Sequence, residues 1–334
     1  MARFISFLLI TILIFTFSAK AQQKIIIEYS QEAHSNSGPL FPLYHSFFHF
    51  IEPGPDKARV FNTRNLRLGL PLSENVDILW MQNHRHDFLS TKSTLSFIQQ
   101  QLKGGNSYFS EDFFLHREKI STGGPGFSWK PGFSNLIFES SLVLLLKNQL
   151  TTDLFIGEIE GNSATGRYER LQSPDSCNSL GLTTHINFSY KRDSEVFGLY
   201  INNLLGFVYF PEIIYRSGQF RYQDYDYDED GYLIVPPIMR GIRRYRPYHH
   251  LLSPEGGLYF SSPEGEMNIR LTDPQSFKLK IFLGNSFSLI SNFPNFALGV
   301  KYQSEKGSWY LLVDDIRPNK IAVLGLGGAI WFSF

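Results

Sequence analysis

The chain has 334 residues, of which 16% are aromatic and only 19% charged, and its 31 basic and 31 acidic residues give a formal charge of zero. This composition excludes a disordered or collagen-like chain, and the neutral total gives no overall attraction to nucleic acid. The single cysteine, Cys177, excludes an intrachain disulfide framework and a zinc site built from several cysteines.

Residues 1–21 have the features of a secretory signal peptide. Arg3 gives a positive start, residues 4–17 are almost entirely apolar, and Ala19 and Ala21 supply the small residues that a cleavage site needs. An apolar run of this length is shorter than the ~20 residues of a transmembrane helix. We therefore expect an exported protein, with cleavage after Ala21.

The mature part, residues 22–334, alternates apolar and polar side chains with a period of two over much of its length. Helical spacing is clear only in residues 93–102, which end at two glycines. Residues 180–190 and 197–201 flank a polar turn and predict a hairpin. Further alternating runs are residues 136–146, 277–283, 296–302 and 309–313.

The length of these runs points to a membrane. Strands of soluble proteins are mostly about five or six residues long, whereas a strand that crosses a bilayer needs about 9–11. Only helices and closed barrels pair every backbone group within hydrocarbon, and no segment after the signal peptide is apolar enough for a helix. The sequence therefore predicts an all-β fold: a single transmembrane antiparallel β-barrel over residues 22–334, of about 12–16 strands, with about 14 the best estimate.

The end of the chain carries the most specific pattern. Counting back from Phe334, alternate positions hold Phe332, Ile330, Gly328, Leu326 and Leu324, and only the glycine departs from an apolar face. This pattern resembles the C-terminal strand of Gram-negative outer-membrane β-barrel proteins. The resemblance implies that the barrel-assembly machinery reads Phe332 and Phe334, and that outer-membrane lipid surrounds the protein. The end of the signal peptide, followed by Gln22-Gln23, resembles exported proteins of Bacteroidota.

An acidic segment follows the predicted hairpin. Asp226, Asp228 and Asp230, followed by Gly231, match the start of calcium loops, in which alternating carboxylates converge on one hard cation. The glutamate that completes an EF-hand is missing, because Pro237 occupies its position. The acidic segment is therefore either a weak calcium site or a solvated acidic loop. We expect no other cofactor.

Four arginines follow closely, namely Arg240, Arg243, Arg244 and Arg246. They could face the acidic segment across a pore mouth and create a field that sorts solutes. They could instead grip lipopolysaccharide phosphates, which suit the guanidinium fork. A third interpretation is that the acidic and basic segments simply pair with each other.

The positions of the histidines indicate packing rather than metal binding or catalysis. The pairs His45 and His49, and His84 and His86, have spacings compatible with a metal, but no carboxylate and cysteine set accompanies them. His185 with Ser189 could form the hydrolytic pair of an outer-membrane lipase, although any barrel of this size supplies such pairs. We do not expect an enzyme.

The polar face of the predicted hairpin would line the barrel interior with His185, Asn187 and Lys191. The favoured function is a passive outer-membrane channel or uptake protein for small or hydrophobic solutes. A structural or partner-binding barrel of a secretion or envelope assembly is the alternative, followed by an outer-membrane lipid hydrolase.

Overall fold

The structure, a computed structural model, describes most of the mature chain. The described residues are 24–35, 57–73, 75–102, 110–133, 135–161, 163–175, 177–222, 226–227, 233–234, 239–272, 276–293, 296–315 and 322–333. The predicted signal peptide lies outside them, so it stays a prediction.

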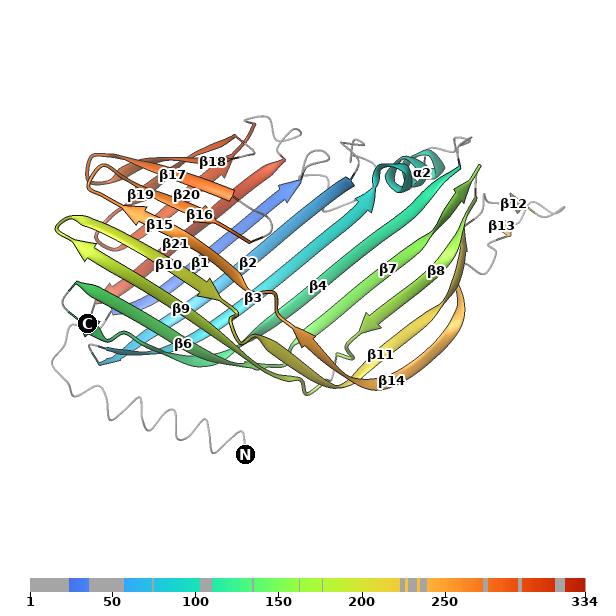
Figure 1. Ribbon diagram of the computed structural model, residues 1–334, viewed down its shortest axis with the longest axis horizontal. Helices are drawn as coiled ribbons and strands as arrows, with labels where there is room; N and C mark the ends of the chain where they lie inside the picture. The colour runs from blue at the N-terminus through green and yellow to red at the C-terminus, as the bar shows by residue number, and fades with distance from the viewer. Residues whose placement is uncertain are drawn as a thin grey trace.

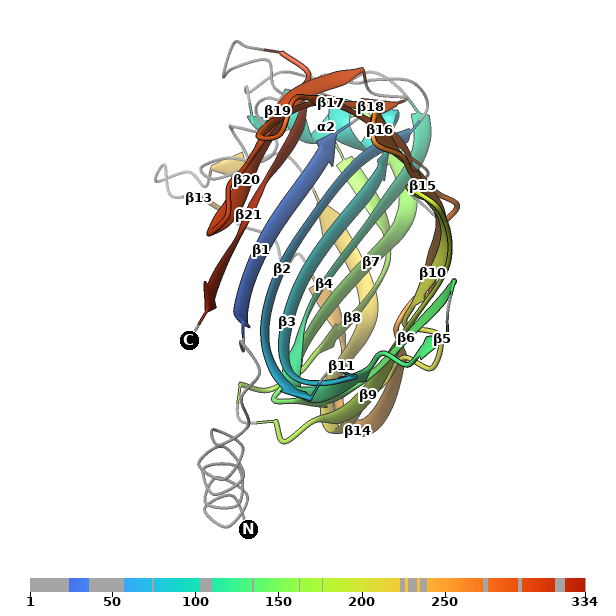
Figure 2. The same ribbon diagram turned by 90° about the vertical axis from the view of Figure 1, so that its left-hand side faces the viewer.

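One antiparallel sheet closes on itself as a barrel (Figures 1 and 2). The first strand, β1 (Lys24–Ser35), pairs with β2 (Lys57–Ser73) on one side and with the last strand, β21 (Val323–Ser333), on the other. The circuit runs from β2 through β3 (Val76–Thr91), β4 (Ser110–Trp129), β6 (Leu136–Leu146), β9 (Leu180–Arg192), β10 (Glu195–Asn202), β15 (Glu255–Ser261), β16 (Gly265–Arg270), β17 (Ser276–Leu283), β18 (Phe287–Phe293), β19 (Ala297–Gln303) and β20 (Gly307–Val313) back to β21. The prediction of an all-β antiparallel barrel is confirmed, and so is the hairpin of β9 and β10.

Several crossings are interrupted partway, so that two strands follow one another in the same direction. β4 pairs antiparallel with β6 over its residues 126–129 and with β7 (Gln149–Glu160) over its residues 110–121. The same relationship links β8 (Ser163–Gln172) to β9, β10 to β11 (Phe207–Tyr222), and β14 (Met239–Leu251) to β15.

These interruptions change the strand count. With the short β5 (Gly132–Phe133), the sheet contains 19 strands, and β12 (Asp226–Tyr227) and β13 (Leu233–Ile234) form a separate pair. The best estimate of 14 strands is wrong, because it assumed that each crossing is one uninterrupted strand.

The two ends of the barrel differ in the length of their connections. Only residues 74–75 join β2 to β3, and residues 193–194 join β9 to β10, at the end where β1 begins and β21 finishes. The opposite end carries longer connections, including residues 36–56 and 223–238. Bacterial outer-membrane barrels have short periplasmic turns and long extracellular loops, so we call these the short-turn end and the long-loop end. β7, β8, β11 and β14 extend the wall toward the long-loop end (Figure 1).

Side chains alternate across the wall as a barrel in lipid requires. On β6, Leu144 and Leu146 point outward and are 41% and 39% exposed, whereas Val143 and Leu145 point inward and are buried. Outward apolar side chains surround the barrel near the short-turn end; among them are Ile27, Tyr29, Trp80, Phe127, Phe188, Leu199, Leu258, Ile281, Leu289, Leu311 and Ile330. A continuous exposed apolar band of this kind is typical of a lipid-facing surface.

Polar side chains close the wall where the crossings are interrupted. The backbone N–H of Asn148 donates to Ser179 Oγ at 2.5 Å, and that hydroxyl donates to the carbonyl of Asn148 at 3.1 Å. The backbone N–H of Leu150 donates to Ser173 Oγ at 2.9 Å. These side chains satisfy backbone groups that a regular ladder would pair, which matters because a buried unpaired group is costly.

The predicted helix at residues 93–102 is confirmed as α2 (Lys92–Leu102). Its Leu95 packs against Ala33, Val60 and Phe88 of β1, β2 and β3. No helix among the described residues is long and apolar enough to span a membrane.

Candidate functional site

The barrel interior contains a polar cavity of about 440 Å³. Its lining comes from β1 and β2 on one wall and from strands of the opposite wall, so it lies inside the lumen. Three acidic and four basic side chains line it, with amides, hydroxyls and two phenols: Glu32, Glu255, Glu266, Arg270, Lys278, Lys280, Lys301, Asn65, Asn202, Asn268, Ser30, Thr63, Ser276, Tyr200 and Tyr310, beside the apolar Ile290 and Leu312.

Ion pairs hold several of these charges. Lys278 on β17 donates to the carboxylate of Glu32 on β1, which joins opposite walls. Lys280 on the same strand lies 3.0 Å from Glu266 on the neighbouring β16. Both lysines point inward because they alternate with the outward Phe277, Leu279 and Ile281.

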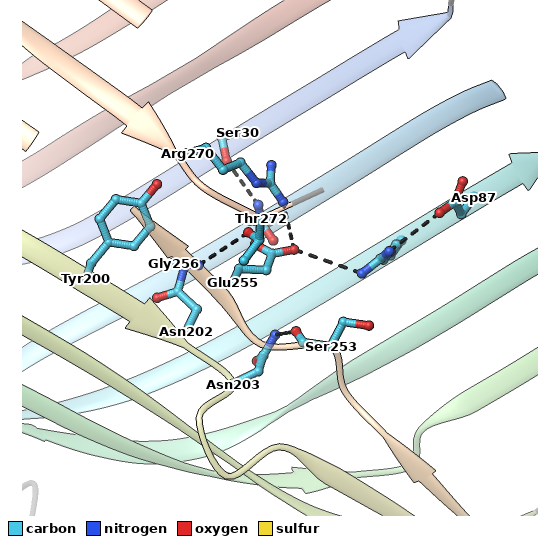
Figure 3. A network of polar contacts seen from close by, with 12 residues as sticks. Ser30, Asp87, Tyr200, Asn202, Asn203, Ser253, Glu255, Gly256, Arg270 and Thr272 are labelled. Atoms are coloured by element: carbon cyan, nitrogen blue, oxygen red, sulfur yellow. Dashed lines mark hydrogen bonds and ion pairs between the residues drawn. The ribbon is translucent and has the colours of Figure 1, made fainter. Parts of the chain in front are cut away.

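A second group of charges crosses the lumen on the long-loop side of the cavity. The guanidinium of Arg270 on β16 lies 2.8 Å from Glu255 on β15, and Arg85 on β3 reaches the same carboxylate at 4.0 Å (Figure 3). Arg85 also lies 3.5 Å from Asp87, which Arg59 contacts at 2.7 Å. We call Arg59, Arg85, Asp87, Glu255 and Arg270 the lumen latch.

The lumen latch surrounds one aromatic ring. Phe61 is only 2% exposed, and the guanidinium carbons of Arg59, Arg85 and Arg270 lie 6.0, 5.2 and 5.8 Å from its ring centroid. Cation–π attraction within about 6 Å stabilises arginine at such a face. The latch thus combines ion pairs and ring contacts, and it connects β2 and β3 to β15 and β16.

A third charged group lies toward the short-turn end. Arg67 approaches Glu139 at 3.4 Å and Glu28 at 4.0 Å, while Lys130 lies 2.8 Å from Asp77 and 3.5 Å from Glu139. The cavity therefore lies between two groups of ion pairs, the lumen latch on its long-loop side and this third group on its short-turn side. A solute that moves along the lumen must pass charges of both signs.

Two of the three residues predicted to line the lumen point into it. His185 Nδ1 lies 3.2 Å from Asn202 Oδ1, and the Tyr259 hydroxyl donates to Asn187 Oδ1 at 3.1 Å. Lys191 has the same inward parity but is exposed near the short-turn end of β9. Ser189 lies four residues from His185 along one strand, about 13 Å away, so the two do not form a hydrolytic pair.

The arginine segment lies on β14, which among the described strands pairs only with β11. Arg240, Arg244 and Arg246 share the face that turns inward, since Arg246 lies over Tyr215 at 4.1 Å and the same face continues into the buried cluster with Tyr248. Arg243 has the opposite parity and donates to the Tyr245 hydroxyl at 2.5 Å. The placement of the first three at the long-loop end is compatible with a pore mouth.

The remaining predicted residues are scattered. Asp226 begins β12, whereas Asp228, Asp230, His45, His49 and Phe334 lie outside the described residues. No group of three or more metal-ligating side chains occurs in the described part, and calcium binding stays a prediction. Phe332 lies on the outward face of β21 and is 47% exposed. His84 and His86 lie on the outward face of β3.

Sequence reasoning missed the lumen latch. Arg59, Arg85, Glu255 and Arg270 are far apart in the chain and have no motif. The only available signal was charge on the polar face of an alternating strand, as at Lys278 and Lys280.

Comparisons with known proteins find likeness in structure only. No family model and no curated protein sequence matches the chain. The Pseudomonas putida toluene transporter TodX is 9% identical with a TM-score of 0.46, covering 96% of this chain and 92% of its own. The translocator domain of the autotransporter NalP from Neisseria meningitidis is 7% identical with a TM-score of 0.34, covering 100% and 96%. The Ralstonia pickettii toluene transporter TbuX is 9% identical with a TM-score of 0.25, covering 94% and 90%. These similar structures are Gram-negative outer-membrane β-barrels.

Proposed function

We propose that this protein is an outer-membrane channel through which small polar solutes diffuse passively. The observation that carries the proposal is the polar cavity inside a wall whose outer surface is apolar. Selectivity in such pores comes from the charges and hydrogen-bonding groups that line them. Lining groups of both signs, with amides and hydroxyls between them, suit neutral or zwitterionic solutes better than hydrocarbons.

The lumen latch would set the rate of passage. Its ion pairs connect opposite walls on the route from the long-loop end to the cavity. Partly buried ion pairs are stable only while both partners stay in place, since an isolated buried charge is costly. Passage therefore requires a solute or water to replace these contacts transiently.

A second candidate is a channel for hydrophobic solutes. The apolar cluster that lines the interior beside the interrupted crossings favours it, with Val143, Leu145, Leu150, Val208, Phe210 and Ile213 among its members. TodX and TbuX, whose structures this chain resembles, are toluene transporters.

Liposome swelling separates the candidates. Proteoliposomes should swell in iso-osmotic glycerol, arabinose or glycine faster than protein-free liposomes. Uptake of radiolabelled toluene into the same vesicles should not exceed that of protein-free vesicles. Saturable toluene uptake without sugar or glycine permeation would overturn the proposal in favour of the second candidate. Permeation of neither class would point to a structural or partner-binding barrel.

A further inference from the structure

The outward face of β2, β3 and β4 changes character sharply along the barrel. Near the short-turn end it is apolar, with Leu68 and Leu66 on β2 beside Trp80 on β3, which is 45% exposed. Two to four residues farther along the same faces, Arg64 and His84 take their place. Because side chains two apart share a face, the basic residues continue the lipid-facing rows beyond the apolar band.

Three basic side chains gather at this border, which we call the basic belt: Arg64, His84 and Lys119. Arg64 and His84 are direct cross-strand partners, and Lys119 is diagonal to His84 through the pairing of β3 with β4. Direct partners have Cβ atoms about 4.5–5.5 Å apart and diagonal ones about 7–8 Å. The long side chains can therefore converge on one group.

Two acidic residues on neighbouring positions, Asp87 and Asp153, contact arginines outside the belt. The charges that act on the imidazole of His84 are those of Arg64 and Lys119, both positive. Asp87 on the same strand points to the opposite face, where it contacts Arg59 and Arg85. Asp153 contacts Arg117 and Arg170. His84 and Lys119 are exposed, and a hydrogen bond of 3.0 Å between Gln82 and His84 orients the imidazole.

We propose that the basic belt binds the phosphorylated headgroup of a glycolipid in the outer leaflet. Cations clustered just beyond an apolar wall match a molecule with acyl chains below and phosphate above. Arginine and lysine both bind phosphate, the former as a fork and the latter as a point charge. The belt requires the outer-membrane location of the proposed channel but not its transport.

This site differs from the arginine segment on β14. Arg240, Arg244 and Arg246 turn toward the interior, where acyl chains of a surrounding bilayer do not reach, whereas the belt lies on the outer wall. The two clusters are comparable because each consists of three basic side chains, and they differ in the face of the wall that they occupy.

Native mass spectrometry of the detergent-solubilised barrel tests the proposal. The wild-type protein and two triple variants are titrated with bisphosphorylated lipid A and with dephosphorylated lipid A. The belt variant is Arg64→Gln, His84→Asn and Lys119→Gln; the control is Arg240→Gln, Arg244→Gln and Arg246→Gln. We expect the belt variant to lose about tenfold or more in affinity for bisphosphorylated lipid A, and the control to keep it. A belt variant carrying Arg64→Lys and Lys119→Arg retains the charge and should retain most of the binding.

The result that would overturn the site is equally definite. The proposed site is wrong if the belt variant binds bisphosphorylated lipid A as tightly as the wild-type protein does, or if the control variant loses as much affinity as the belt variant. It is also wrong if the wild-type protein binds dephosphorylated and bisphosphorylated lipid A equally. Displacement by millimolar inorganic phosphate as effective as by lipid A would show an anion site without lipid specificity. Gel migration before and after heating verifies folding, and unchanged solute permeation of the belt variant separates this proposal from the channel proposal.

Discussion

Lys278 and Glu32, which are 246 residues apart in the sequence, form an ion pair across the lumen. The pair links β17 to β1, which are separated by several strands of the circuit. It therefore fixes the distance between opposite walls and partly fills the cavity.

Replacing Lys278 with Met should open the cavity and leave Glu32 without its partner. We expect higher conductance and a shift toward cation selectivity, because a carboxylate without its counter-ion attracts cations. Reversal potentials in a KCl gradient measure the shift. The double variant Lys278→Met with Glu32→Gln should restore wild-type selectivity while keeping the higher conductance. A shift of the single variant toward anions would contradict this role.

Replacing Glu255 with Gln should shift the ion selectivity in the opposite direction, toward anions. Arg85 and Arg270 would lose the carboxylate that they share, so the pore should become more anion-selective. The same reversal-potential measurement detects the change. Glu264→Gln is the matched control, since Glu264 is exposed in the turn between β15 and β16, and it should leave selectivity unchanged.

The interrupted crossings should depend on their polar side chains. Ser179→Ala would leave the backbone groups of Asn148 without a partner in a buried place, as Ser179 is only 4% exposed. We expect a loss of about 1–3 kcal/mol in the free energy of unfolding. Urea unfolding in detergent micelles measures it, with Ser194→Ala, in the exposed turn between β9 and β10, as the control. Equal stability of both variants would show that the interruption between β6 and β7 does not depend on the Ser179 hydroxyl.

The position of the bilayer can be tested with one substitution on either side of the breaks. Leu199→Arg places a cation in the outward apolar band, which should cost about 2–4 kcal/mol. Ile214→Arg, on β11 beyond the break, should cost about 1 kcal/mol or less, because this partly exposed side chain alternates with the buried, inward Ile213 and lies on the outer face of the extended wall outside the band. Folding into vesicles under urea gives both values. Similar costs would contradict the placement of the band.

The alternation of side chains made much of the fold predictable. The hairpin of β9 and β10, the helix α2 and the barrel class all follow from residues close together in the chain. The interruptions do not, because Lys147 and Asn148 look like any polar pair between apolar runs, and only the pairing of β4 with both β6 and β7 shows that the strand resumes in the same direction.

The site was less predictable for a related reason. A lumen residue such as His185 can be assigned from parity within its own strand. The contact of Glu255 with both Arg85 and Arg270 depends on how the sheet closes, which no local pattern encodes. The outward direction of His84 could be inferred from Trp80, but only once the apolar band was placed.

Single-channel recording in planar bilayers tests the central claim most directly. If the barrel is a channel restricted by the lumen latch, the wild-type protein should give discrete current steps, and Glu255→Gln should give larger ones with a shift toward anions. If neither protein conducts while both fold and insert, the lumen is closed to solutes and the channel account is wrong.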